Sequence, residues 1–466
     1  MKYIILTILL VSTIVNTSLK SQNELKLLST WSDSSLIGSN AFNNIYNEVW
    51  GLAVNNSEFA VVGSTAGTHF INITNPDNIF EAFFVEGGTS GGQIIHRDYH
   101  DNQGFLYAVA DEGANSTMQI IDIQNLPNSI NVVYDSNAFI RRTHNIFIDS
   151  SSNIMYACIS SGTQLPFARL RTFDISDPMN PQVGQDYASV DGFFFQQVHD
   201  AFVIRDTAYL NCGPGGFALV DFSNPADPEL LYGLSPQDYP QSGYNHSGWL
   251  SPDGKTYVMA DENHGMDMKV FDATNKNELE LIGLINAGSD SDFSIPHNQI
   301  IHGNYLYASY YYDGIQVYDI EDPTNVTRDF YYETSSIEHR ESYEGAWGVY
   351  PFLPSGNILV SDMQTGLFVL EGPGSITSGV NDNYMNLTAE ISPNPNNGHF
   401  DVNITRDHFT EGAHLDIFDT NGQKVFSSNL TSARSTIDIE GLANASYYYT
   451  LISSTYRKTG KLVVIQ

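Results

Sequence analysis

The chain has 466 residues, with 53 acidic and 20 basic side chains and a formal net charge of -33. Such an excess of negative charge repels phosphate backbones and anionic membrane faces, which excludes nucleic acid as an expected partner. Only two cysteines, Cys158 and Cys212, occur in the sequence. This excludes a scaffold built on disulfides and leaves two buried thiols or one optional bridge.

Residues 1–21 have the pattern of a secretory signal peptide. Lys2 precedes an apolar run from Tyr3 to Val15, and a short polar stretch follows. The run is too short to span a membrane, and no cysteine near the expected cut could carry a lipid anchor. No later segment has eighteen continuous apolar residues. We therefore expect an exported mature chain without a transmembrane segment.

Residues 22–371 repeat one unit at intervals of about fifty residues. Each unit opens on a polar residue, and its third strand ends in a turn that usually contains proline, as in LRTFDISDP (Leu170 to Pro178). The seven openers are Glu48, His96, His144, His199, His246, His297 and Glu344. EVWG near the start and EGAWG near the end are interpreted as the same position in the first and seventh units.

A unit of this length suits four short strands, so the sequence predicts an all-β, seven-bladed β-propeller. The seventh unit lacks an outer strand. The run from Leu25 to Trp31 is expected to fill that place, closing the ring and removing an open sheet edge. A long β-solenoid is the competing architecture, although it leaves the N-terminal strand without a place.

The openers should lie around one mouth of the central channel, because they begin the innermost strands. Carboxylates that follow the second strands should reach the same rim; they are Asp111, Glu112, Asp261, Glu262, Asp313 and Asp362. Imidazole together with carboxylate suits zinc, manganese, iron or copper, whereas carboxylates alone suit calcium. Asp98 and Asp200, beside their histidines, could orient the imidazole rings. The sequence thus predicts a site for a divalent metal ion or a polar ligand.

Three interpretations of this rim remain open. The histidines could bind a metal ion, a glycan or a protein; they could join strands and blades through hydrogen bonds alone; or a bound cation could activate water in a hydrolase or lyase. No nucleophile elbow, phosphate loop or HExxH motif occurs, so a binding module is favoured over an enzyme. A metal site requires three or four ligand atoms to converge.

The composition changes after the propeller. Residues 372–389 are rich in glycine, serine and asparagine and predict a linker. Residues 390–466 contain five alternating runs and an Asn421-Gly422 hairpin signal, which predict a small β-sandwich.

The C-terminal unit resembles a known family through SPNPNNGHF, LDIFDTNGQKVF, IDIEGL and KLVVIQ. Together these stretches look like the type A sorting domain of the type IX secretion system. The resemblance implies that the type IX machinery is a partner of residues 390–466, and that the propeller is released or attached to surface lipopolysaccharide. Asn444 and Ser446 depart from the family, which tends to place glycine before the aromatic strand.

The propeller resembles the choice-of-anchor B proteins, which are related to LVIVD-repeat propellers. The resemblance rests on EVWG, RTHNIFID, HSGWLSPDGKTYVMADE and WGVYPFLPSGNILVSDMQTGLFVLEG, and it spans about residues 44–371. It implies a propeller with cell-surface attachment and supplies no settled activity. We therefore expect an exported, surface-located or released binding module.

Overall fold

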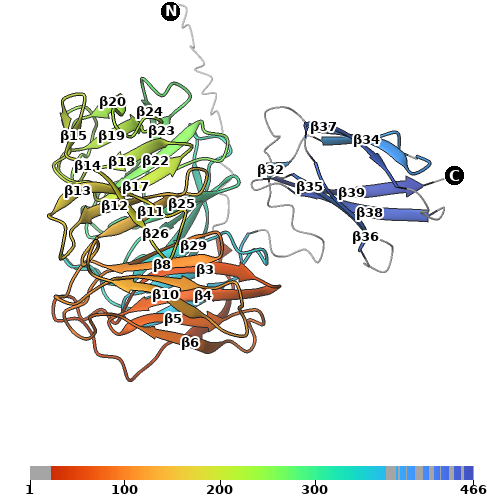
Figure 1. Ribbon diagram of the computed structural model, residues 1–466. Helices are drawn as coiled ribbons and strands as arrows, with labels where there is room; N and C mark the ends of the chain where they lie inside the picture. The colour runs from red at the N-terminus through yellow and green to blue at the C-terminus, as the bar shows by residue number, and fades with distance from the viewer. Residues whose placement is uncertain are drawn as a thin grey trace, which may run out of the picture.

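The computed structural model describes residues 23–373 and most of the C-terminal unit (Figure 1). In that unit, the described segments are 385–386, 389–394, 396–404, 413–418, 424–430, 432–439, 445–452 and 456–464. The predicted signal peptide and most of the predicted linker lie outside these residues. Every regular element of the described part is a β-strand, and no helix there could cross a membrane.

Residues 23–373 form seven sheets in which consecutive strands pair antiparallel from the inside outward. The first sheet contains β3 (Tyr46–Val54), β4 (Ser57–Ser64), β5 (Gly67–Asn72) and β6 (Phe80–Glu86). The second contains β7 (Arg97–Asn102), β8 (Phe105–Ala110), β9 (Met118–Asp122) and β10 (Asn131–Ser136). The third contains β11 (Asn145–Asp149), β12 (Ile154–Ser160), β13 (Ala168–Asp174) and β14 (Gln182–Tyr187). A two-stranded hairpin follows, β15 (Ser189–Val190) with β16 (Phe193–Phe194).

The later sheets repeat this order. The fourth contains β17 (Asp200–Ile204), β18 (Thr207–Asn211), β19 (Phe217–Asp221) and β20 (Glu229–Leu234). The fifth contains β21 (Asn245–Leu250), β22 (Thr256–Asp261), β23 (Met268–Asp272) and β24 (Glu280–Ile285). The sixth contains β25 (Gln299–His302), β26 (Tyr305–Ser309), β27 (Ile315–Asp319) and β28 (Thr327–Tyr332). The seventh contains β29 (Ala346–Tyr350), β30 (Ile358–Asp362), β31 (Gly366–Leu370) and β2 (Leu27–Trp31).

The innermost strands contact one another in sequence from β3 to β29, and β29 contacts β3, so the sheets form a closed ring (Figure 1). This is a β-propeller, as the repeat predicts. Inner and middle strands such as β31 are buried along their length, whereas outer strands such as β14 are largely exposed. The buried clusters join neighbouring sheets. One of them, between the third and fourth sheets, contains Cys158 and Cys212 as free, buried thiols.

The N-terminal segment closes the ring. β2 pairs antiparallel with β31, from Leu27 opposite Leu370 to Trp31 opposite Leu367, which confirms the predicted closing strand. The residues just before it do more than the sequence predicts. β1 (Asn23–Glu24) pairs in parallel with β28, and Leu25 is buried in the cluster shared by the sixth and seventh sheets. The segment therefore ties these two sheets together.

The C-terminal unit has two sheets. One contains β32 (Met385–Asn386), β39 (Tyr456–Val464), β38 (Ala445–Ile452), β35 (His414–Phe418) and β36 (Lys424–Asn429). The other contains β33 (Ala389–Ser392), β34 (His399–Ile404) and β37 (Arg434–Asp438). Both contribute to one buried cluster that includes Phe400, Val402, Leu415 and Leu451. Strand pairing begins at Met385, inside the predicted linker, because β32 adds to the edge of β39.

Removing residues 23–32 is expected to lower the melting temperature of the protein by several degrees or more and to promote aggregation. The deletion removes the outer partner of β31, so a strand whose residues are all buried in the parent becomes an open sheet edge. It also removes Leu25 from the cluster shared by the sixth and seventh sheets. Thermal unfolding with light scattering measures both effects. A deletion variant that melts at the parent temperature without aggregating would show that the ring does not depend on this strand.

Candidate functional site

Five histidines and one tryptophan form a closed circle of aromatic rings at one mouth of the channel. The centroids of His96 and His144 are 4.9 Å apart, and His199 lies 4.1 Å from both His144 and His246. His297 follows at 4.6 Å from His246. Trp347 completes the circle, at 4.5 Å from His297 and 5.3 Å from His96. We call these six residues the histidine ring.

Backbone carbonyls orient two of these histidines. The Nδ1 atoms of His199 and His297 lie 3.0 Å and 2.6 Å from the carbonyl oxygens of His246 and Trp347. A carbonyl oxygen only accepts, so each Nδ1 must donate its proton, and in the neutral ring Nε2 then carries a lone pair. No hydrogen-bond partner meets either Nε2 within the described residues. A histidine with one nitrogen held in this way has the arrangement typical of metal ligands.

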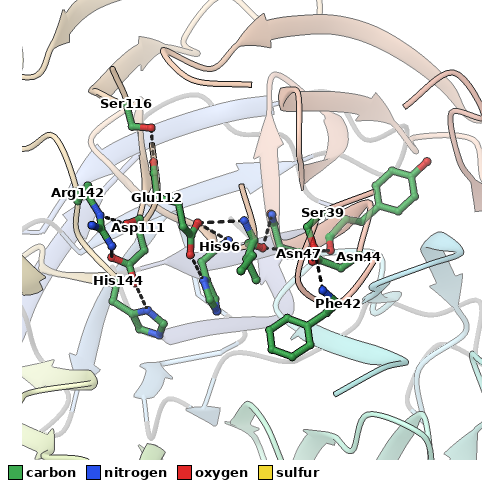
Figure 2. Close-up of polar contacts among 12 residues, drawn as sticks. Ser39, Phe42, Asn44, Asn47, His96, Asp111, Glu112, Ser116, Arg142 and His144 are labelled. Carbon is green, nitrogen blue, oxygen red and sulfur yellow. Dashed lines mark hydrogen bonds and ion pairs between the residues drawn. The ribbon is translucent and has the colours of Figure 1, made fainter. Parts of the chain in front are cut away.

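Carboxylates orient His96 and His144 in the same sense. The Nδ1 of His96 donates to Glu112 Oε1 at 2.5 Å, and the Nδ1 of His144 donates to Asp111 Oδ2 at 2.9 Å. Figure 2 shows the two carboxylates on one side and the two imidazole rings on the other. Carboxylate, imidazole and metal ion in sequence is a frequent arrangement in metal sites.

The first sheet contributes no histidine to the ring. Asparagines in its inner strand and just before it instead hold the backbone that leads into the second sheet. Asn44 and Asn47 both donate to the carbonyl oxygen of Ile95, each at 3.0 Å. Glu112 Oε2 accepts from the backbone N–H groups of Ile95 and His96, again at 3.0 Å. These contacts, seen in Figure 2, fix the backbone from which His96 extends.

His246 differs from the other four. Its Nε2 lies 3.7 Å from Glu262 Oε2, beyond hydrogen-bonding distance, and Glu262 Oε1 accepts from the Tyr311 hydroxyl at 2.6 Å. Its buried Nδ1 has no partner with hydrogen-bond geometry among the described residues, although the His297 carbonyl lies close enough to raise its pKa slightly. This leaves an imidazole nitrogen and a carboxylate oxygen near each other without a bond.

The pKa values of the ring separate into two groups. Burial lowers the pKa of His297 to about 3, and burial together with neighbouring histidines holds the pKa values of His199 and His246 well below the ordinary range. These rings are neutral at physiological pH. Burial would lower the pKa of His144 too, but the hydrogen bond and charge of Asp111 outweigh it and raise that pKa. Burial opposes ionisation of Asp111, yet His144 and other nearby cations keep its pKa low.

Beneath the ring, a middle layer of polar side chains lines a cavity of about 60 Å³, room for several water molecules. Its carboxylates are Glu48, Asp98 and Asp200. Burial raises the pKa values of Glu48 and Asp200 to about 7, and burial and the charge of Glu48 raise that of Asp98 strongly. The layer therefore holds negative charge only at a cost, which a nearby cation would reduce.

Aromatic rings fill the channel on the far side of the middle layer. The centroids of Trp50 and His100 are 4.8 Å apart, and those of His100 and Phe147 are 4.9 Å apart. Trp249 lies 6.0 Å from Phe147 on one side and 6.0 Å from Phe352 on the other. His100 is thus packed in the channel rather than exposed in a loop. This aromatic layer lies on the side of the middle layer away from the histidine ring, and Trp50, Phe147 and Trp249 also line the cavity.

Four carboxylates predicted for the rim serve other purposes. Asp261 forms a fully buried ion pair with Lys269 at 2.8 Å, and Asp362 accepts from the backbone of its own turn and from Thr334. Asp313 accepts from Ser294 and lies 3.0 Å from His339, over a separate surface pocket. Glu344 pairs with Arg340 and accepts from Tyr312. These four carboxylates therefore have partners outside the histidine ring.

Three other predicted positions need correction. Glu48 lies in the middle layer and not in the ring, where its Oε2 accepts from Asn298 at 2.9 Å. Asp98 and Asp200 do not orient imidazoles; they accept from the backbone N–H groups of Ile146 and Ala201. The orienting groups are Asp111, Glu112 and two carbonyls.

Sequence reasoning missed Trp347 as the seventh sheet's contribution to the ring. EVWG and EGAWG look alike, but Trp50 lies in the aromatic layer at the opposite end of the channel. Register irregularities occur between Tyr46 and Val49 in β3 and between Ala346 and Val349 in β29. The sequence does contain a sign of this difference: EGAWG has one residue more than EVWG between the glutamate and the tryptophan.

Two groups of ring residues could each hold a metal ion. In one, ligand atoms of His96, Asp111 and His144 all lie within 4.8 Å of one another; in the other, so do those of His246, Glu262 and His297. Both groups combine imidazole with carboxylate, the donor set of zinc and copper sites.

Residues 390–466 match the family of secretion system C-terminal sorting domains. A type IX sorting domain directs its protein through the secretion machinery to the surface or the exterior. This protein is exported. A comparison with curated protein sequences gives no significant match.

Among the solved structures, the match to RRP9 supports the propeller fold alone. The WD40 repeats of RRP9 match with a TM-score of 0.50 and 7% identity, covering 75% of this chain and 99% of that one. PorZ, a surface component of the type IX secretion system of Porphyromonas gingivalis, matches with a TM-score of 0.44 and 11% identity, covering 93% of this chain and 61% of PorZ. The propeller of Cps50 (Swd1) from Myceliophteria thermophila matches at 0.47 and 10% identity, with 73% and 98% coverage.

Asp200→Asn is expected to stabilise the metal-free protein more at pH 8 than at pH 5.5. The folded protein holds the Asp200 proton up to about pH 7, whereas the unfolded chain releases it near pH 4. Raising the pH between these values favours the unfolded parent, a loss that the variant avoids. Its advantage in the free energy of unfolding should grow by on the order of 1–2 kcal/mol. Urea unfolding in EDTA measures it.

Asp272→Asn is the matched control for this experiment. Asp272 is the last residue of β23. Hydrogen bonds from the Thr274 side chain and from the Thr274 N–H, the latter at 2.8 Å, keep its pKa low. Its substitution should bring no advantage that increases with pH. If Asp200→Asn also shows none, the middle-layer carboxyl is not held protonated.

Proposed function

We propose that this protein is an exported surface propeller that binds a divalent transition-metal ion through the histidine ring. The observation that carries this proposal is the common orientation of four imidazoles. The Nδ1 atoms of His96 and His144 donate to carboxylates, and those of His199 and His297 donate to backbone carbonyls. In all four residues Nε2 is left without a partner in the part of the protein that the structure describes. Such a set of lone pairs is suited to a metal ion.

The donor atoms favour zinc or copper over calcium or magnesium. Neutral imidazole binds zinc, copper and nickel well, whereas calcium and magnesium prefer oxygen donors. Three ring histidines are neutral at physiological pH, so protons compete weakly for their nitrogens. Asp111, Glu112 and Glu262 would offset part of the charge of the ion.

A purely structural role fits these histidines less well. His69, in the first sheet, shows what a structural histidine looks like in this protein. Its Nε2 lies 2.8 Å from the Ser64 hydroxyl and its Nδ1 lies 3.1 Å from Glu81, so both nitrogens have partners. In a ring built only for support, the Nε2 atoms would be satisfied in the same way.

The propeller and its sorting domain together suggest how the site is used. The type IX machinery carries the protein out of the cell by residues 390–466, and the propeller then presents the ring at or beyond the surface. We include in this proposal membership of the choice-of-anchor B family, on the motifs of residues 44–371, with seven blades and a C-terminal sandwich. Metal-dependent hydrolysis or elimination at the ring would require a substrate beside the ion.

Titration of the purified exported protein with Zn²⁺ or Cu²⁺ should show tight binding that survives excess Ca²⁺ and Mg²⁺. In His144→Gln/His297→Gln, which removes two of the oriented nitrogens, affinity should fall by roughly 100-fold or more. Calorimetry measures both proteins, and circular dichroism confirms that the variant is folded.

His69→Gln is the matched control, because it changes a buried histidine outside the ring. It should bind the metal like the parent even if it is less stable. A parent without affinity for Zn²⁺ or Cu²⁺, or a folded double variant that binds as well as the parent, would refute the proposed function.

A further inference from the structure

The two groups of possible ligands occupy opposite arcs of the histidine ring. The first arc is His96 and His144 with Asp111; the second arc is His246 and His297 with Glu262. His199 stands between the arcs on one side, with centroid distances of 4.1 Å to His144 and His246, and Trp347 stands between them on the other. Tryptophan is not a ligand, so it divides the donor set.

A single central ion would not satisfy this ring. Six rings with neighbouring centroids 4.1–5.3 Å apart place their common centre about 4–5 Å from each centroid. A zinc ion bound to imidazole nitrogen at about 2.0–2.1 Å lies only about 3.2 Å from the ring centroid. An ion bound to the nitrogens of one arc is therefore too far from the nitrogens of the other arc to bind them.

Each arc has the spacing of a site of its own. The 3.7 Å between His246 Nε2 and Glu262 Oε2 is too long for a hydrogen bond. It is close to the roughly 3.4 Å that separates two donors of one tetrahedral zinc ion. On the first arc, ligand atoms of His96, Asp111 and His144 all lie within 4.8 Å of one another. Asp111 orients His144 through Oδ2, and the exposed Arg142 guanidinium lies 3.6 Å from its other oxygen.

Carboxyl groups border both arcs, and bound dications would favour their ionised forms. Asp111 and Glu112 border the first arc and Glu262 borders the second. The middle layer adds Glu48, Asp98 and Asp200 directly below, three carboxyls that lie together around one cavity. Cations above them would be favoured by this charge.

We propose that the histidine ring binds two transition-metal ions, one in each arc. This inference rests on the proposed function and adds its stoichiometry. The two sites are unequal. The first arc is partly open to solvent, whereas His246 and His297 are 3% and 4% exposed and Glu262 is held by the Tyr311 hydroxyl. The first ion should therefore exchange faster than the second.

Metal analysis of the full exported protein after equilibration with Zn²⁺ and removal of unbound metal tests the proposal. We expect two ions in the parent and one each in His96→Gln/His144→Gln and His246→Gln/His297→Gln. A chromophoric chelator should remove the two ions of the parent in a fast and a slow phase. Each variant should lack a different phase, the first pair the fast one and the second pair the slow one.

A measurement on the parent protein alone tests the number of ions even if the variants do not fold. Loaded with Cu²⁺, two ions within one ring should show magnetic dipolar coupling by electron paramagnetic resonance. His69→Gln should keep both ions and both phases. One ion in the parent, lost in both pair variants, would overturn the two-ion inference and leave the proposed function intact; no ion in the parent would refute both.

Discussion

Closure of the ring of sheets is the constraint on which the rest of this structure depends. Because β2 supplies the outer strand of the last sheet, the two ends of the propeller segment are joined and all innermost strands share one channel. Residues that open successive strands are then held in a circle with neighbouring rings in contact. Histidines that are spread over two hundred residues of sequence are thereby brought into contact. The N-terminal segment, which also pairs with β28, is thus as important to the site as its side chains.

Within that circle, the chemistry is decided by what each Nδ1 contacts. A histidine bonded at both nitrogens, such as His69, is structural. Within the described part of the chain, four of the five ring histidines are bonded at Nδ1 only. His96 and His144 donate to two carboxylates of the second sheet, and His199 and His297 donate to carbonyls of the fifth and seventh sheets. Beneath them lie three carboxyls whose pKa values are raised by burial, and beyond those an aromatic layer fills the channel. The ring and the middle layer are therefore polar and suited to cations.

The sequence was sufficient for the propeller, its closing strand and the gathering of five histidines at one mouth, since a repeat of constant length places equivalent residues equivalently. It failed where strands depart from regular register. Irregularities in β3 and β29 put Glu48 below the ring and bring Trp347 into the position expected of Glu344. Asp261 was predicted for the rim because the sequence does not show that it pairs with buried Lys269 on the neighbouring strand. The carbonyls that orient His199 and His297 could not be predicted either, because every residue has a backbone carbonyl and the sequence does not mark which one is near.

The proposed metal binding depends on unprotonated Nε2 atoms in the ring. Nitrogen NMR of the protein selectively labelled with ¹⁵N-histidine, free of metal and at neutral pH, tests this claim most directly. We expect His199 and His297 to be neutral, with the proton on Nδ1. Adding Zn²⁺ should shift their Nε2 signals and leave those of His69 unchanged. Protons on Nε2 in these residues, or no change on adding metal, would contradict it.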